Sequence, residues 1–174
     1  MILGITGGIG SGKSYVCRQM TEWLNIPVYD CDSQAKRLTA TNEDIRRALV
    51  ALVGPGVYDD HGQLQKGVLA AYLFASDDHA RSVNGIIHPA VRRDFLQWVE
   101  RQHAPVVALE SAILYESGFD ELVDKVVFVD ASRETRIERC IRRDGCTRQQ
   151  VLERMERQNS DLARERAHII IRNE

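Results

Sequence analysis

Short apolar runs rich in β-branched residues alternate with longer amphipathic segments along this chain. Strands that are buried on both faces of a parallel sheet read as continuous apolar runs, because neither face meets water. The runs predict strands at about 2–6, 26–29, 105–109, 126–130 and 168–171. Amphipathic segments between them imply right-handed βαβ connections. The pattern therefore predicts an α/β fold with a parallel sheet flanked by helices.

The helical pattern is denser in the middle of the chain than at its ends. Helices are predicted at about 13–24, from about 33, and at 42–53, 66–75, 77–86, 90–102, 133–143 and 147–158. Several short helical pieces between residues 54 and 89 separate two core strands, and Gly54, Pro55, Gly56 and Gly62 mark turns among them. This segment predicts a helical insertion, a natural place for a second substrate.

The first predicted strand leads into GGIGSGKS at 7–14, which fits the P-loop pattern G-x-x-x-x-G-K-[ST]. Glycines let backbone N–H groups approach a polyphosphate, and the helix that begins at Lys13 adds partial positive charge. Lys13 can reach the β- and γ-phosphates, and the Ser14 hydroxyl can bind Mg²⁺. A chance match in a chain of this length is about one in a hundred or rarer. We therefore expect nucleotide binding.

Length and charge restrict the remaining possibilities. The 174 residues suit one α/β domain, and a net charge of −2 indicates neither a nucleic-acid nor an anionic membrane partner. Four cysteines lack metal-ligand spacing and are typical of a reducing compartment. With no apolar run near 18 residues and no signal-peptide pattern, we expect a cytoplasmic protein.

Acidic residues follow two of the predicted strands. Asp30 and Asp32 come after the second strand, at the edge where ligands bind in open α/β sheets. One could activate an acceptor hydroxyl and the other hold a Mg²⁺ water, although an Asx turn and N-cap for a helix at Ser33 is also possible. Glu110 ends the third strand and could meet the Mg²⁺ water shell, a role that Asp130 after the fourth strand fits equally well.

Nineteen of the 23 basic residues are arginine, and eleven of these lie between residues 133 and 172. On a helix, Arg136, Arg139 and Arg143 fall within an arc of roughly 60°. Such a stripe suits phosphate binding, or else a solvated surface relieved by neighbouring glutamates. The break at 144–145 predicts a helix–turn–helix flap over the phosphate site. His88 precedes Pro89, which we expect to open a helix carrying Arg92, although a His in this context is often a structural turn residue.

Several motifs in one order resemble those of the dephospho-CoA kinase family over residues 1 to 173. They are TGGIGSGKS, DCD at 30–32, the run ending IIHPAVRR, RCIRRDG at 139–145, RMERQ at 154–158 and RAHIIIRN at 166–173. Three positions depart from the family: AILYE at 112–116 lacks its usual proline, Tyr15 replaces a threonine, and His168 replaces an aspartate.

The resemblance implies that ATP, with Mg²⁺, phosphorylates the ribose 3′-hydroxyl of dephospho-CoA, and it says nothing of oligomeric state. It implies catalytic roles for Asp32, Lys13 and Arg139, and acceptor binding by Asp32, His88 and Arg92. Mg²⁺ would be held by Ser14, with Glu110 reaching it through water. The implied ATP-binding residues are Gly8, Ile9, Gly10, Ser11, Gly12, Lys13, Ser14, Tyr15, Arg143 and Asn173.

The implied fold is a three-layer α/β/α P-loop kinase domain spanning 1–174. Its core would comprise about 1–53, 104–132 and 165–174, with an acceptor-binding insertion at 54–103 and a lid at 133–164. Another small P-loop kinase for a nucleoside, nucleotide or sugar is the nearest alternative. A GTP-dependent switch would need an N-K-x-D motif, which the sequence lacks. A pseudo-enzyme would need a damaged P-loop or a lost carboxylate, and both features are intact.

Overall fold

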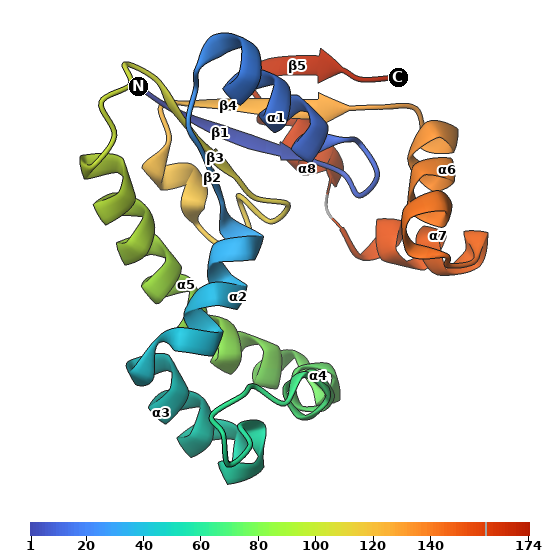
Figure 1. The fold of residues 1–174 in the computed structure, drawn as a ribbon. Helices are drawn as coiled ribbons and strands as arrows, with labels where there is room; N and C mark the ends of the chain where they lie inside the picture. Colours follow the sequence, from blue (N-terminus) through green and yellow to red (C-terminus); the bar gives the residue numbers. More distant parts are fainter. Residues whose placement is uncertain (159) are drawn as a thin grey trace. The chain divides into compact units, whose positions relative to one another are not determined.

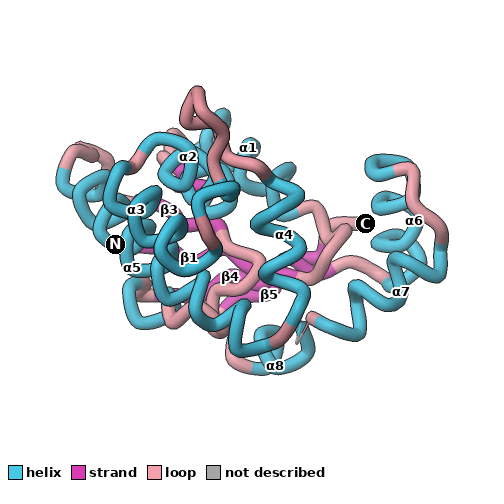
Figure 2. The backbone as a smooth tube through the Cα atoms, turned by 90° about the horizontal axis from the view of Figure 1, so that it is seen from below, coloured by secondary structure: helices cyan, strands magenta, loops and turns pink. Residues whose placement is uncertain are grey.

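The computed structural model describes residues 1–158 and 160–174. These divide into two compact units, one formed by Met1–Asp30 with Gln102–Glu174 and the other by Cys31–Arg101. Figure 2 shows that all strands belong to the first unit, whereas helices and loops make up the second. The second unit begins well before the insertion predicted from residue 54.

The first unit contains a five-stranded parallel sheet, as the apolar runs predicted (Figure 1). The strands follow the order β2-β3-β1-β4-β5, which places the first strand in the centre. Every pair is parallel, so all carboxyl ends lie along one edge. The strand bounds are β1 Ile2–Gly7, β2 Val28–Asp30, β3 Val107–Glu110, β4 Lys125–Asp130 and β5 Ile169–Arg172.

Helices cover both faces of this sheet, which explains why its central strands are apolar throughout. Helix α1 (Lys13–Leu24) packs on β1 and β3, and α8 (Ser160–Glu165) packs on β1 from the opposite face. The core residues between α1 and the sheet are Leu3, Ile5, Val16, Cys17, Ala108, Val127 and Val129. Strand β5 is different: it forms an edge, and its residues are mostly exposed.

A helical hairpin follows β4 in the first unit, as the sequence predicted. Helix α6 (Arg133–Asp144) is capped at its N-terminus by Ser132, whose hydroxyl accepts from the Thr135 N–H. Gly145, with a φ of 65°, caps its C-terminus. Helix α7 (Arg148–Arg157) begins with a capping box between Thr147 and Gln150. A short 3₁₀ helix, η2 (Phe119–Leu122), precedes β4. These signals are local, which is why both helices could be predicted closely.

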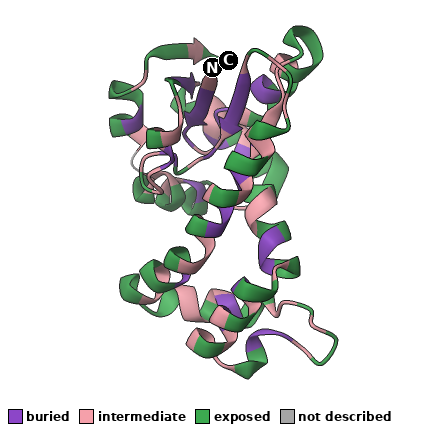
Figure 3. Cartoon of the chain, turned by 90° about the vertical axis from the view of Figure 1, so that its left-hand side faces the viewer, coloured by how far each residue is buried: buried purple, intermediate pink, exposed green. Residues whose placement is uncertain are grey.

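The second unit is helical, and its elements are α2 (Cys31–Thr41), α3 (Glu43–Val53), η1 (Pro55–Val57), α4 (Lys66–Ala75) and α5 (Asp77–Glu100). Helix α5 packs on α2, α3 and α4. Its buried side chains include Val83 and Phe95, and Leu49 of α3 is also fully buried. Figure 3 shows how these buried stripes alternate with exposed faces, as amphipathic helices require.

One prediction for this unit is wrong. Pro89 does not open a helix, because α5 runs unbroken from Asp77 to Glu100 with Pro89 inside it. A proline removes one backbone donor and crowds the preceding turn, but packing against three other helices stabilises α5 through that position. The alternative of an N-cap for a helix at Ser33 does not apply to Asp32, because α2 begins at Cys31 and Asp32 lies within its first turn.

Candidate active site

The loop between β1 and α1 is shaped by glycines at positions that a side chain could not occupy. Gly10 and Gly12 adopt φ values of 78° and 86°, in the left-handed region. A Cβ on Gly10 would also collide with the Arg136 carbonyl oxygen, and one on Gly12 with the Asn173 side chain. The Ser11 N–H donates to the Gly8 carbonyl at 3.1 Å, which closes the turn. The loop therefore depends on glycine for both its conformation and its close neighbours.

A cavity of about 270 Å³ opens at this loop and is lined by several cationic side chains. The Lys13 Nζ donates to the Gly7 carbonyl oxygen at 2.9 Å, so the lysine curls over its own loop. Cationic groups and a helix N-terminus around one cavity suit a polyphosphate. The lining residues are Gly10, Gly12, Lys13, Ser14, Tyr15, Arg139 and Arg143.

A hydroxyl and two carboxylates lie at the carboxyl ends of β1, β2 and β3. The Ser14 Oγ donates to the Glu110 Oε1 at 3.1 Å. Asp30 is the register partner of Glu110 in the sheet. Burial raises the pKa of Glu110 above its ordinary value; the Asp30 charge also raises it, whereas the Ser14 hydrogen bond and Lys13 lower it. Oxygen donors of this kind are those that Mg²⁺ prefers.

Glu110 and Asp130, the two acidic residues considered for a Mg²⁺ water shell, make different contacts. Asp130 accepts from the Arg164 Nε at 3.1 Å, and its backbone carbonyl accepts from the Asn173 N–H. Glu110 instead contacts the P-loop serine. The sequence pattern indicates Asp30 only together with Asp32. In the structure Asp30 lies beside Glu110 at the edge of the sheet. Sheet register was the missing signal, because it cannot be read from a single strand.

The arginine stripe of α6 contacts the P-loop through backbone oxygens. The Arg136 Nε donates to the Ile9 carbonyl at 2.9 Å. The Arg139 Nη1 donates to the carbonyls of Asn173 and Ser11, at 2.7 Å and 3.3 Å. The Asn173 side chain donates to the same Ser11 carbonyl at 2.9 Å. Arg139 and Asn173 therefore converge on one oxygen of the loop, from α6 and from the end of β5.

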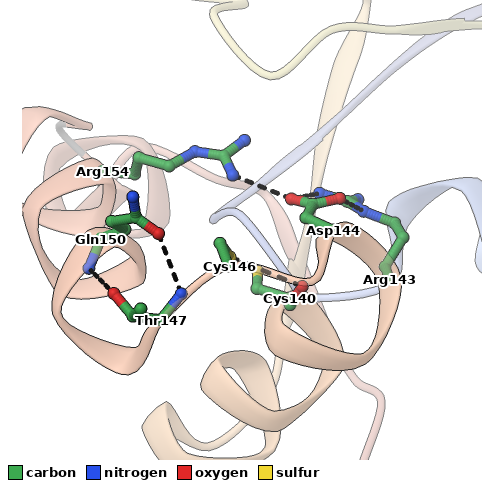
Figure 4. A network of polar contacts seen from close by, with 7 residues as sticks. All are labelled: Cys140, Arg143, Asp144, Cys146, Thr147, Gln150 and Arg154. Carbon is green, nitrogen blue, oxygen red and sulfur yellow. Dashed lines mark hydrogen bonds and ion pairs between the residues drawn. The ribbon is translucent and has the colours of Figure 1, made fainter.

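Arg143 is held differently from the other two members of the stripe (Figure 4). Its Nε and Nη2 donate to the Asp144 carboxylate at 2.6 Å and 3.0 Å. The same carboxylate accepts from the Arg154 Nη1 of α7 at 2.8 Å. The stripe is thus neither a free phosphate clamp nor a plain solvated face, since two arginines contact the loop and the third is paired.

Gln158 supports the P-loop from the end of α7, a role that the sequence pattern did not assign. The Ile9 N–H donates to its Oε1 at 2.7 Å. Its Nε2 donates to the carbonyls of Gly7 and Ala112, at 3.3 Å and 3.1 Å. The only sequence signal was the resemblance of RMERQ to a family motif. Gln158 belongs to the site because its side chain joins the P-loop both to the end of α7 and to the segment after β3 at Ala112.

Two residues that depart from the family pattern make defined contacts in the structure. The His168 Nδ1 accepts from the Val126 N–H at 3.1 Å, and the His168 N–H donates to the Val126 carbonyl. His168 therefore extends the pairing of β4 with the segment before β5. The ring of Tyr15 is about half exposed and lies under the Arg18 guanidinium, 5.7 Å from its centroid.

The residues expected to bind the acceptor all belong to the second unit. Asp32 and Lys36 of α2 line an apolar cavity of about 280 Å³, together with Ala35, Thr39, Leu64, Leu69 and Ile87. A second cavity of about 590 Å³ shares Lys36 and Leu64 with the first. His88 follows Ile87 on α5, and burial lowers its pKa below the ordinary value. Arg92 is half-buried one turn later.

A parallel sheet in this order, with a glycine loop after its central strand and arginines from a helical hairpin against that loop, defines a P-loop kinase. The family model for dephospho-CoA kinase matches residues 1–174. The dephospho-CoA kinase of Bacteroides fragilis strain YCH46 is 47% identical over 99% of this chain and 84% of its own length. That of Porphyromonas gingivalis is 48% identical over 88% of this chain and 75% of its own length. The chain belongs to the dephospho-CoA kinase family.

Solved structures share this fold. TT1252 from Thermus thermophilus superposes with a TM-score of 0.84 and 32% identity, covering the whole chain and 88% of its own length. A dephospho-CoA kinase from Campylobacter jejuni gives a TM-score of 0.67 at 19% identity, covering 99% of this chain and 87% of its own. A shikimate kinase from Bacteroides thetaiotaomicron shares the fold at a TM-score of 0.56 and 16% identity, covering 99% and 85%.

Helices long and apolar enough to cross a bilayer do not occur among residues 1–158 and 160–174.

Proposed function

We propose that this protein transfers the γ-phosphoryl group of ATP to the ribose 3′-hydroxyl of dephospho-CoA, giving CoA and ADP. The observation that carries the proposal is the cationic cavity at the P-loop in a chain that matches the dephospho-CoA kinase family throughout. ATP is the donor, and its polyphosphate supplies the negative charge that this cavity lacks. The acceptor is assigned to the second unit, where Asp32 lines an apolar cavity.

The donor side relies on the P-loop and the residues packed against it. Backbone N–H groups of Gly8 to Ser14 bind the β- and γ-phosphates, and Lys13 turns from the Gly7 carbonyl to the phosphates. Arg139 stabilises negative charge on the transferring group, close to the Ser11 carbonyl that positions it. Asn173 and Tyr15 border the same nucleotide site. Each of these roles requires charge or backbone donors, which the cavity provides.

Mg²⁺ fits the oxygen atoms at the strand ends. The Ser14 hydroxyl would bind the ion directly, and Glu110 would reach it through a water molecule. The ion supplies charge that neutralises the β- and γ-phosphate oxygens. The Asp30 and Glu110 carboxylates would stabilise a cation at this edge. The cation would in turn favour the ionised form of Glu110 and so oppose the burial that raises its pKa.

The acceptor side relies on one carboxylate and an apolar wall. Asp32 orients the 3′-hydroxyl and accepts its proton, as a general base must do at hydrogen-bond distance. Leu64, Leu69 and Ile87 form the apolar wall, which suits the uncharged part of dephospho-CoA. His88 is favoured in its neutral form by burial and can donate or accept a hydrogen bond, whereas Arg92 offers a cation to the substrate's phosphates.

A coupled assay of ADP release tests the proposal. We expect release that depends on dephospho-CoA, and none above background with shikimate, adenosine or a nucleoside monophosphate as acceptor. ADP formation without any dependence on dephospho-CoA would overturn the assignment. We also expect the protein to act in the cytoplasm, a reducing compartment in which its four cysteines would remain thiols.

A further inference from the structure

Asp144 connects the two helices of the hairpin through a single carboxylate. One oxygen accepts from the Arg143 Nε at 2.6 Å, and the other accepts from the Arg143 Nη2 at 3.0 Å and the Arg154 Nη1 at 2.8 Å. Figure 4 shows the carboxylate lying between the two guanidinium groups. The Asp144 side chain is 26% exposed, whereas both arginines are about half exposed or more. The aspartate is therefore the most sheltered member of this network.

The pairing restrains the arginine that borders the phosphate cavity. An unpaired arginine on a surface helix samples many rotamers, and binding a phosphate would cost much of that side-chain entropy. A two-point contact with Asp144 fixes the plane of the Arg143 guanidinium, and the pair does not use its Nη1 group. Arg143 in this position lines the cavity with Lys13 and Arg139.

We propose that Asp144 is a positioning residue for ATP, which holds Arg143 against the phosphate cavity and shares its carboxylate with Arg154 of α7. This inference rests on the proposed function, because it requires the triphosphate to bind beside Arg143. Asp144 itself touches neither the loop nor the cavity wall in the contacts described above. Its effect on ATP therefore passes through Arg143.

Charge supports the same conclusion. Lys13, Arg139 and Arg143 around one cavity repel each other before the nucleotide binds. A carboxylate beside Arg143 offsets part of that repulsion without entering the cavity. The Arg143 guanidinium, followed by that of Arg154, holds the pKa of Asp144 well below its usual range. The carboxylate therefore stays ionised at any pH at which the protein is assayed.

The hairpin has other contacts that hold its helices together, so Asp144 is not needed for that purpose. Glu134 of α6 accepts from the Arg148 Nη1 and Nη2 of α7 at 2.8 Å and 2.6 Å. The buried side chains of Ile137, Cys140 and Val151 pack between the helices. The Glu134 pair, like the Asp144 network, joins α6 to α7 through a carboxylate and an arginine, but neither of its members lines the phosphate cavity.

These two pairs provide a matched test, in which Asp144→Asn is compared with Glu134→Gln. Both substitutions remove one carboxylate charge from a pair between α6 and α7. We expect Asp144→Asn to raise the KM and the Kd for ATP about tenfold, the usual loss for a charged hydrogen bond, with the KM for dephospho-CoA unchanged. Glu134→Gln should leave all three constants at the wild-type values. Titration of ATP into the protein gives the Kd without catalysis.

A double-mutant cycle with Arg143→Ala distinguishes positioning from a general effect on the fold. Arg143→Ala alone should weaken ATP binding at least as much, and adding Asp144→Asn to it should change nothing further. Equal effects of Asp144→Asn and Glu134→Gln would overturn the inference, as would additive effects in the cycle. An unaltered Kd for ATP in Asp144→Asn would overturn it as well. A wild-type protein that releases no ADP with dephospho-CoA would instead contradict the proposed function.

Discussion

The cavity at the P-loop in the first unit and the cavity beside Asp32 in the second unit are lined by different kinds of groups. The first is made of backbone N–H groups, glycines and cationic side chains, held by residues far away in the sequence, such as Gln158 and Asn173. The second is walled mainly by aliphatic side chains of helices, with Asp32 and Lys36 at its boundary. A loop that binds phosphate through glycines and cationic side chains can be recognised as a sequence motif. A cavity lined by aliphatic side chains from scattered positions cannot be recognised in this way.

The largest effect is expected for Asp32→Asn in the second unit, which should reduce catalysis without changing ATP binding in the first unit. Asp32→Asn keeps the shape of the side chain but cannot accept the proton of the 3′-hydroxyl, so kcat should fall about 10³-fold. The Kd for ATP should not change. Asp44→Asn is the control, because Asp44 is an exposed carboxylate of the same unit paired only with Arg47 in the contacts described. Near wild-type turnover in Asp32→Asn would remove Asp32 from the chemistry.

Lys13→Ala should give the reverse pattern, with a loss confined to the donor side. Removing the Lys13 ammonium takes away a cation at the β- and γ-phosphates, so kcat/KM for ATP should fall about 10²-fold or more. The Kd for dephospho-CoA, measured by titration without ATP, should stay at the wild-type value. A loss of dephospho-CoA affinity in this variant would show that the two sides are not separate.

A smaller effect should appear in the pH dependence of stability through His88. Burial lowers the pKa of His88, so the folded protein binds fewer protons there than the unfolded chain. This contribution to stability is present above the ordinary histidine pKa of about 6.5 and is lost as the pH falls towards the lowered value. His88→Gln should therefore flatten the decline of the free energy of unfolding between about pH 7 and pH 5. Urea unfolding across that range checks it, and parallel curves for the two proteins would contradict it.

The smallest effect is expected at Tyr15, where the P-loop departs from its family. The proposed function assigns the phosphate contacts there to backbone groups, and the ring is half exposed, so Tyr15→Thr should change the KM for ATP by less than about threefold. Steady-state kinetics at saturating dephospho-CoA measures this constant. A change above tenfold would assign the ring a direct role in nucleotide binding.

The same contrast explains which features could be predicted from the sequence. The strands, the P-loop turn and the two helices of the hairpin depend on neighbours along the chain, and the prediction of each agrees with the structure. The unbroken helix through Pro89 depends on packing by α2, α3 and α4, which outweighs the local preference of proline. The contacts of Gln158 with Ile9 and Gly7 join residues about 150 positions apart, so no local pattern encodes them.

Some site assignments remain predictions because they concern bound molecules. The roles of Arg139, His88 and Arg92 follow from motif order and from their places on α6 and α5. The division into core, insertion and lid is also a prediction, alongside the observed boundary at Cys31. The preference for Glu110 over Asp130 is likewise a prediction, supported by their different contacts in the structure, because both residues follow apolar strands.

The central claim is that the phosphoryl group leaves ATP and arrives on one particular hydroxyl. Incubation with ATP and dephospho-CoA, followed by phosphorus NMR of the purified product, locates the new phosphate directly. We predict a single new phosphomonoester on the ribose 3′-oxygen, formed in equal amount to ADP. A phosphate at another position, or ADP accompanied only by inorganic phosphate, would contradict the account.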